Sequence, residues 1–268
     1  MGLLLSILVI ALVVLVHEYG HYVLMRRNGV QVVEFTIGFG PTLFERKLKS
    51  GTMFRIKPIL LGGYTRPVAE GDGTVDSKSA WARFKIYMAG MFFNATAAFV
   101  VYAVLTYATH RAPVFVVNIA HMTHAPPALM PLVCALIMSY GLWLATPAVL
   151  VWMVAQGMQQ FFGGMAGPIG IMGMGGSVVA ASPTAGMLLV NALSFFAMLN
   201  IGLAGFNLLP VYPLDGGRVF DILLEKVFGK RSQNVIRIYR TVSTVSLLAF
   251  IALIILSDVL KAFLHFGQ

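Results

Sequence analysis

Charged residues are scarce in this sequence. Only 11% of its 268 residues are charged and 58% are hydrophobic, whereas soluble domains carry charge on about a quarter of their residues. Such a chain has too little polar surface to cover a globule in water. The single cysteine, Cys134, excludes a disulfide within the chain. We therefore expect a membrane protein whose main solvent is lipid.

Lysine and arginine are missing from one long stretch, between Arg111 and Arg218. Eleven lie from Arg26 to Lys85 and six from Arg218 to Arg240. Membrane proteins keep such basic loops on the cytoplasmic side. We therefore expect a multi-pass protein of the inner (plasma) membrane, with its N-terminus outside. The net charge of +9 then reflects topology and contact with anionic headgroups, and we expect no nucleic acid partner.

Apolar runs of the length that crosses a bilayer, about 20 residues, occur four times. The expected spans are residues 2–25, 86–109, 185–209 and 241–264. The first run lacks the basic start and the cleavage site of a signal peptide. An extra apolar region, residues 128–162, must cross an even number of times if both basic loops share one side. It either lies at the interface or re-enters, or it crosses twice.

The remaining segments are short. Residues 30–68 are rich in β-branched and aromatic residues with glycine and proline between them, which predicts strands. Ser77 or Ser79 is a candidate cap for the second span. The glycine-rich stretch 163–176 lacks a phosphate-loop lysine, so we expect a loop and close helix packing and no nucleotide. The predicted fold is one domain, residues 1–268: an all-α polytopic membrane protein with four core transmembrane helices, a small membrane-associated β segment and the extra hydrophobic region.

The stretch "HEYGH" places three titratable residues in the first apolar run. On a helix His17 and His21 lie one turn apart on the same face. Two imidazoles at this spacing can reach one Zn²⁺ at about 2.0–2.1 Å. Glu18 stands beside the first histidine, where it can serve as a general base.

A structural interpretation of this motif competes with the metal site. The histidines could be satisfied by neighbouring helices, with Glu18 as their partner. An ionisable group inside the bilayer costs at least about 2.5 kcal/mol, however, and three together at ligand spacing favour a functional site.

A hydrolytic zinc site usually has a third protein ligand, and the stretch "NLLPVYPLDGG" offers Asp215. It lies three residues before the second basic loop, and His21 lies five residues before the first, so both have similar depth. Pro210 and Pro213 must break the helix before it. The alternative role of Asp215 is to cap the helix that follows. The acids of that helix, Asp221 and Glu225, are expected on its solvated face.

Together these motifs resemble those of the site-2 proteases, which are intramembrane zinc metalloproteases. The resemblance rests on "HEYGH", "GFGP" to "LLGGY", "AGMFFNATAA", "GPIGI" and "NLLPVYPLDGG". It implies that His17, His21 and Asp215 bind Zn²⁺ and that Glu18 is the catalytic base. It further implies substrate-binding roles for Asn94, Asn207, Gly62, Gly63 and Tyr64, the last three in a strand that pairs with the substrate.

Two features depart from the family pattern. Tyr212 stands where the family usually has proline, with Pro213 following, and we expect the helix break to survive. The interval between the second and third spans holds residues 128–162 where bacterial relatives often carry PDZ domains, so we expect a type that lacks PDZ filtering of substrates.

The sequence thus predicts a zinc-dependent endopeptidase that cuts transmembrane segments of single-span proteins in regulated intramembrane proteolysis. Its site should lie near the cytoplasmic face. One alternative is a catalytically inert family member that binds membrane helices. A metal transporter is the other, although transport needs polar ligands across the bilayer and the motifs form one cluster.

Overall fold

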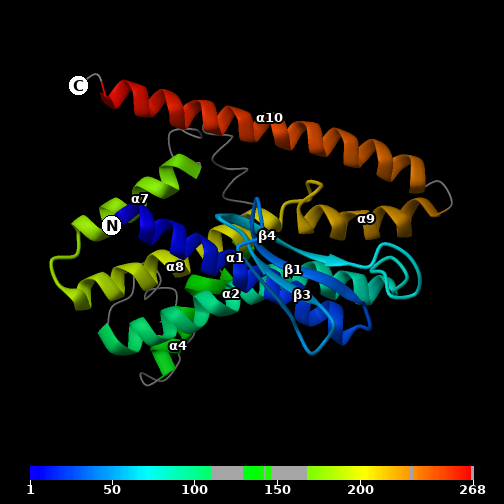
Figure 1. Cartoon of the computed structure of the whole chain (residues 1–268), viewed down its shortest axis with the longest axis horizontal. Helices are drawn as coiled ribbons and strands as arrows, with labels where there is room; N and C mark the ends of the chain where they lie inside the picture. Colours follow the sequence, from blue (N-terminus) through cyan, green and yellow to red (C-terminus); the bar gives the residue numbers. More distant parts are fainter. Residues whose placement is uncertain (110–128, 142, 146–167, 230–231, 267–268) are drawn as a thin grey trace.

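The computed structural model describes residues 1–109, 129–141, 143–145, 168–229 and 232–266 (Figure 1). Its helices are α1 (Gly2–Arg27), α2 (Ala80–Thr109), α4 (Met130–Leu136), α7 (Pro168–Ala180), α8 (Ala185–Asn207), α9 (Asp215–Phe228) and α10 (Ser232–Phe266), with a π-helical turn η2 (Ile137–Gly141) after α4. Its strands are β1 (Val32–Phe39), β2 (Phe44–Lys47), β3 (Met53–Ile56) and β4 (Ile59–Pro67).

Four of these helices are long and apolar enough to cross a membrane: α1, α2, α8 and residues Ser232–Val259 of α10. With the four-stranded sheet, they confirm the predicted class of a mostly helical polytopic membrane protein. Helices α2 and α10 begin at Ala80 and Ser232, before the predicted starts at 86 and 241. Hydropathy marks only the lipid-compatible part of a helix, whereas backbone hydrogen bonding continues into its polar first turns. The Ser79 hydroxyl caps α2 by accepting from the Ala82 N–H at 3.3 Å.

Helix α2 lies at the centre of the molecule and contacts α1, α4, α8 and α9. Small residues lie at its interface with α8, where Ala98 and Ala197 are fully buried and pack together with Ile201. Small side chains let membrane helices approach closely, which replaces the hydrophobic driving force that lipid cannot supply.

Helix α7 packs on the first part of α1. The Ser6 hydroxyl donates to the Met172 carbonyl at 3.0 Å and accepts from the Gly175 N–H at 3.1 Å. The prediction of a loop over 163–176 was wrong for residues 168–176, which are helical. The predicted close packing is present, because glycines in a helix leave room for a neighbouring backbone.

The sheet has the strand order β2-β3-β1-β4. β1 pairs parallel with β3 and antiparallel with β4, and β2 pairs antiparallel with β3. One face of β1 rests on α1, where the Phe35 ring stacks on Tyr22 with the ring centroids 5.5 Å apart. β4 is therefore an edge strand beside the helix that carries the "HEYGH" motif.

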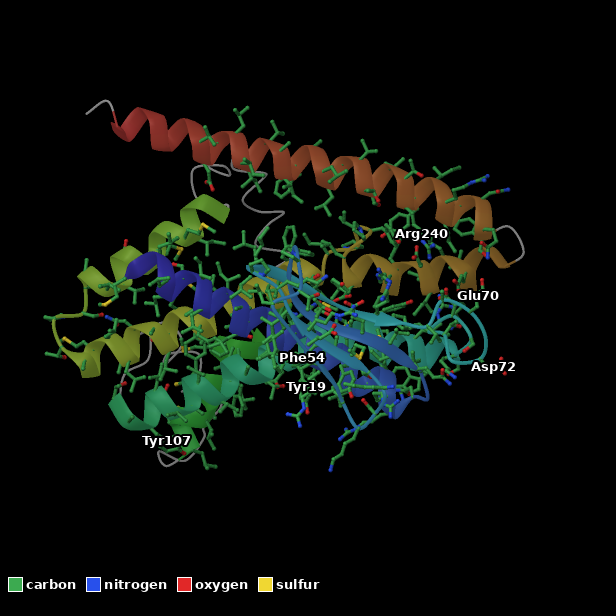
Figure 2. All side chains as sticks on the ribbon, viewed as in Figure 1. Tyr19, Phe54, Glu70, Asp72, Tyr107 and Arg240 are labelled. Carbon is green, nitrogen blue, oxygen red and sulfur yellow. The ribbon has the colours of Figure 1, made fainter. Side chains whose placement is uncertain are left out.

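Helices α9 and α10 are held by ion pairs. Asp221 is 1% exposed and accepts from the Arg240 Nε at 2.9 Å, and Glu225 is bound by Arg83 of α2. Figure 2 shows Arg240 on α10. The expectation of a solvated face was wrong for Asp221, which is buried against Arg240, whereas the Glu225 side chain stays 33% exposed while it pairs with Arg83.

The extra hydrophobic region is described only in part. Residues 130–141 form α4 and η2, which pack against α2. Most of the remainder, residues 146–162, lies outside the described residues, so its predicted even number of crossings stays a prediction.

Candidate metal centre and catalytic pocket

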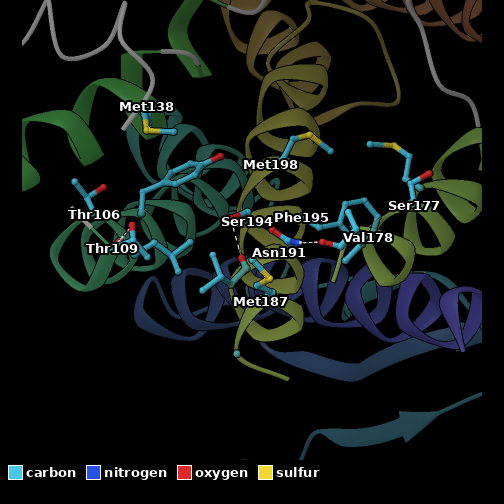
Figure 3. Close-up of a pocket in the computed structure, with 16 residues that line it drawn as sticks. Thr106, Thr109, Met138, Ser177, Val178, Met187, Asn191, Ser194, Phe195 and Met198 are labelled. Atoms are coloured by element: carbon cyan, nitrogen blue, oxygen red, sulfur yellow. Dashed lines mark hydrogen bonds between the residues drawn. The ribbon is translucent and has the colours of Figure 1, made fainter. Parts of the chain in front are cut away.

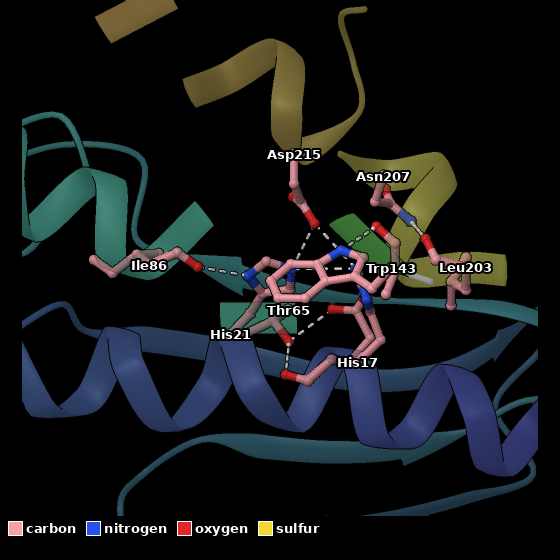
Figure 4. Close-up of polar contacts among 10 residues, drawn as sticks. His17, His21, Thr65, Ile86, Trp143, Leu203, Asn207 and Asp215 are labelled. Carbon is pink, nitrogen blue, oxygen red and sulfur yellow. Dashed lines mark hydrogen bonds and ion pairs between the residues drawn. The ribbon is translucent and has the colours of Figure 1, made fainter. Parts of the chain in front are cut away.

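Three side chains from two distant segments converge on one point (Figure 4). The Asp215 Oδ2 lies 3.1 Å from the His17 Nε2 and 3.0 Å from the His21 Nε2, and the two nitrogens are 3.3 Å apart. Ligands about 2.0–2.1 Å from a tetrahedral Zn²⁺ lie about 3.3 Å from one another. The three atoms therefore have the spacing of three corners of such a tetrahedron. The predicted juxtaposition of these residues is present in the structure.

A backbone contact orients one of the imidazoles. The His21 Nδ1 lies 2.8 Å from the Ile86 carbonyl oxygen of α2. A carbonyl can only accept, so Nδ1 donates this hydrogen bond and Nε2 faces the cluster. This arrangement is typical of metal-binding histidines, whose second nitrogen is held by an outer partner.

Gly90 of α2 makes room for the cluster. A Cβ at this position would lie 2.5 Å from the His21 Nε2 and 2.6 Å from the His17 Cε1. Any side chain would therefore occupy the space that a cation bound by the imidazoles requires. Gly90 was not among the predicted site residues, because the close approach joins two helices that are separate in the chain.

The break between α8 and α9 delivers Asp215. Helix α8 ends at Asn207 and α9 begins at Asp215, with Leu214 as its N-cap and no side-chain cap. Asp215 thus binds the histidines and does not cap the helix. Gly216 is buried against the Leu208 and Leu209 carbonyls, which a Cβ would contact. Only glycine lets the chain fold back this tightly.

The charge of Asp215 suits a cation ligand. Burial by itself raises the pKa of this carboxyl, but the facing imidazoles of His21 and His17 hold its pKa well below the usual range. The side chain is 14% exposed, so an ionised carboxylate is retained in a largely buried place. Two imidazoles and a carboxylate form a donor set that fits Zn²⁺.

Glu18 lies in the same cavity, which has a volume of about 490 Å³. Its Oε2 accepts a hydrogen bond from the Thr65 hydroxyl of β4 at 2.9 Å. Helix α1, β4, the first part of α2 and the α8–α9 connection all contribute lining residues. A base, a candidate metal site and a strand edge therefore share one small cavity.

Residues 5–250 of the chain match the model of peptidase family M50. The chain belongs to peptidase family M50. This match confirms the resemblance to the site-2 proteases that the motifs indicated.

Curated relatives of the M50 chain carry the name "Putative zinc metalloprotease". One from Streptococcus pneumoniae is 42% identical over 79 residues, which are 30% of this chain and 19% of that protein. One from Thermotoga maritima is 38% identical over 110 residues, 37% of this chain and 22% of that protein. One from Xylella fastidiosa is 44% identical over 87 residues, 29% of this chain and 20% of that protein. The M50 chain thus matches about a fifth of each relative's length. Family and names agree with the predicted cofactor, Zn²⁺.

The predicted substrate-binding residues of the M50 chain have different locations. Asn207, Gly63 and Tyr64 line the cavity. Gly62 faces the Phe39 ring, which a Cβ there would contact at 2.6 Å. Asn94 is fully buried between helices, and neither its Oδ1 nor its Nδ2 has a hydrogen-bond partner among the described residues.

A second cavity of about 1380 Å³ lies between α2, α7, α8 and η2 (Figure 3). Its lining is apolar and hydroxylic, with methionines such as Met187 and Met198 and the polar Asn191. No acidic, basic or histidine side chain is among the described residues that line it. The described lining of the larger cavity therefore offers no metal ligand and no acid or base to a hydrolytic reaction.

Proposed function

We propose that this M50 chain is a zinc-dependent endopeptidase that cuts single-span membrane proteins within or near their transmembrane segments. The observation that carries the proposal is the tetrahedral spacing of the His17, His21 and Asp215 ligand atoms beside Glu18. When bound there, Zn²⁺ supplies Lewis acidity that raises the acidity of water and polarises an amide carbonyl.

The protein's own groups handle the proton. The Glu18 carboxylate takes the proton of the attacking water and passes it to the leaving amide nitrogen. The C–N bond of the peptide breaks, and the products are a carboxylate and an amine.

The edge of β4 offers the substrate a place to bind. A helical substrate must unwind before its scissile carbonyl is accessible, and its backbone groups then need new partners. One side of β4 pairs with β1, and residues 63–67 of the strand line the cavity. We propose that the unwound segment pairs with this edge. The Asn207 Nδ2 donates to the Leu203 carbonyl at 3.0 Å, which leaves its Oδ1 to accept from a substrate amide.

Asn94 belongs to the same proposal in a different way. Its side chain is fully buried with both polar atoms unpartnered among the described residues, and such atoms are costly in an apolar environment. A substrate backbone that reaches between the helices would satisfy them.

The charge distribution supports an orientation. Both basic segments flank the metal centre, one after His21 and one after Asp215. We propose that the centre lies near the cytoplasmic face of the inner membrane and that the N-terminus lies outside. Water then has a short path to the site. A role in regulated intramembrane proteolysis follows from the same proposal.

The test is co-expression of a tagged single-span substrate with the wild type, Glu18→Gln or the matched control Glu70→Gln. Glu70 is exposed on the loop after β4 (Figure 2). We expect cleavage by the wild type and by Glu70→Gln, and none by Glu18→Gln. Cleavage that persists in Glu18→Gln would contradict the role of this base. An inert family member would leave the substrate uncleaved in all three co-expression experiments.

A metal measurement on the purified protein separates the alternatives further. We expect one zinc per chain in the wild type and in Glu18→Gln, and less than a tenth of that in Asp215→Ala. Among the described residues, His17, His21 and Asp215 form one metal-binding group, which supports hydrolysis over transport. Zinc uptake into proteoliposomes without any cleavage of the substrate would contradict the proposed peptidase function and favour transport.

A further inference from the structure

The two faces of β4 have different partners. Side chains alternate across a strand, and Gly63 and Thr65 point to α1. A Cβ at Gly63 would lie 3.3 Å from the Glu18 Cγ, and the Thr65 hydroxyl donates to the Glu18 Oε2 at 2.9 Å. The strand therefore lies directly against the side chain of the proposed base.

The opposite face of β4 is anchored on one buried acid. The Tyr64 hydroxyl donates to the Glu34 Oε1 at 2.9 Å, and the Arg66 Nη2 lies 2.6 Å from the Glu34 Oε2. The Glu34 residue is only 2% exposed. Because a slip of one residue would exchange the two faces, these bonds fix the register that turns Thr65 toward Glu18.

The Thr65 hydroxyl has one proton and two acceptors in reach, the Glu18 Oε2 at 2.9 Å and the Glu18 backbone carbonyl at 3.1 Å. A charged acceptor forms the stronger hydrogen bond, so the carboxylate takes the proton. None of the described residues donates to the other carboxylate oxygen, Oε1. That oxygen remains available for water while Oε2 is held.

We propose that Thr65 is a positioning residue for catalysis: its hydroxyl holds the Glu18 carboxylate in the orientation that accepts a proton from water. The inference rests on the proposed function of Glu18. A free glutamate side chain explores several rotamers, and the Thr65 bond confines it. Because Thr65 lies on the strand that we propose pairs with the substrate, the same element orients both the base and the peptide.

The experiment compares Thr65→Val with Thr65→Ser in the purified full-length protein, using cleavage of a fluorogenic single-span substrate in proteoliposomes. Valine keeps the shape and removes the hydroxyl, whereas serine keeps the hydroxyl. A hydrogen bond to a charged group corresponds to roughly tenfold or more in rate. We expect Thr65→Val to lower kcat at least tenfold and Thr65→Ser to stay within threefold of the wild type, with KM changed less than threefold in both.

Three further readouts separate positioning from a structural role. Zinc content and the thermal unfolding midpoint of Thr65→Val should match those of the wild type. Thr244→Val, which removes a hydroxyl bond to the Arg240 carbonyl on α10, should leave kcat unchanged. In a Glu18→Asp background, where the carboxylate is too short to reach Thr65, adding Thr65→Val should change kcat less than threefold.

The outcomes are distinct. Equal kcat values for Thr65→Val and Thr65→Ser would overturn the positioning role, as would an equal loss on adding Thr65→Val to the wild type and to the Glu18→Asp variant. A loss of zinc or of thermal stability in Thr65→Val that accounts for its lower rate would also overturn it. A wild type that cleaves nothing, or a Glu18→Gln variant that cleaves normally, would instead refute the proposed function itself.

Discussion

At the scale of single residues, the site depends on glycines that lack a side chain as much as on the candidate ligands. Gly90 contributes no side chain, and the space this leaves is where His17 and His21 point. Gly216 has the same role in the connection that carries Asp215. The ligands alone do not make a metal centre, because the backbone must also approach closely enough to bring them together.

Gly90→Ala should therefore abolish metal binding while the fold is kept. The new methyl group would lie 2.5 Å from the His21 Nε2, and the imidazole would turn away because a side chain moves more easily than two packed helices. We expect zinc content to fall at least tenfold by elemental analysis. Gly202→Ala is the matched control, since a Cβ there meets nothing within 4 Å. Full zinc occupancy in Gly90→Ala would contradict this account of the glycine.

Glu34 should give the protein an acid-sensitive component of stability. Burial by itself raises the pKa of Glu34, but hydrogen bonds from Arg55, Thr36 and Tyr64 lower it from 4.5 to about 2. A lowered folded-state pKa means that the stabilisation is fully present above pH 4.5 and is lost as the pH falls toward 2.

The measurement is the thermal unfolding midpoint of the purified protein between pH 7 and pH 3. We expect Glu34→Gln to have a lower midpoint at pH 7 and a flatter dependence on pH. The control Glu45→Gln changes a side chain that is 53% exposed and should follow the wild type. Parallel curves of unfolding midpoint against pH for the wild type and Glu34→Gln would show that this carboxylate contributes nothing to the pH dependence of stability.

At the scale of elements, α9 is positioned by its neighbours. Arg83 of α2 forms two bonds to Glu225, at 2.6 and 2.9 Å, and Arg240 of α10 binds Asp221. These pairs hold the helix whose first residue is Asp215. The alignment of the candidate ligand Asp215 with two histidines on α1 is therefore set partly by ion pairs further along α9.

Breaking the Arg83–Glu225 pair should weaken metal binding at a distance. Arg83→Met removes two charge-assisted hydrogen bonds to a carboxylate that is 33% exposed and leaves α9 less firmly held. We expect a lower unfolding midpoint and a weaker zinc affinity in competition with a chelator. The swapped pair Arg83→Glu with Glu225→Arg should recover part of both losses. Unchanged zinc affinity in Arg83→Met would show that α9 is positioned without this pair.

Several elements were predictable from local pattern, and others were not. The four long helices follow from apolar runs of the right length, and the strands from β-branched residues punctuated by glycine. The buried state of Asp221 was missed, because its partner Arg240 lies 19 positions away on another helix. Likewise, no periodicity in the sequence relates Thr65 to Glu18.

At the scale of the whole molecule, the candidate metal centre joins helix α1 to helix α9. Helix α1 provides the histidines and α9 the aspartate, so a bound cation links segments that are almost 200 residues apart. A ligand that binds only the folded state stabilises it by mass action. The sheet lies at the same end of the molecule as α9 (Figure 1), and this end carries both basic segments.

Chelation should therefore lower the thermal unfolding midpoint of the wild type by several degrees, and added Zn²⁺ should restore it. Asp215→Ala should start from the lower midpoint and respond to neither treatment, because it lacks one of the ligands that join α1 to α9. Differential scanning fluorimetry in detergent measures both. A midpoint that chelation leaves unchanged in the wild type would mean that the metal contributes little to the folded state.

The amino-acid sequence by itself determined the membrane class, the four long helices and the presence of strands, and it indicated the three candidate ligands and the proposed base. Hydropathy, composition and charge distribution gave the helices and strands, the 3.6-residue helical period related His17 to His21, and depth beside a basic loop together with the family resemblance pointed to Asp215. The tertiary structure decided which small residues admit the cation, which hydroxyl holds Glu18 and which arginines neutralise α9. Those choices join segments far apart in the chain, and only packing in three dimensions brings a donor within 3 Å of a particular acceptor.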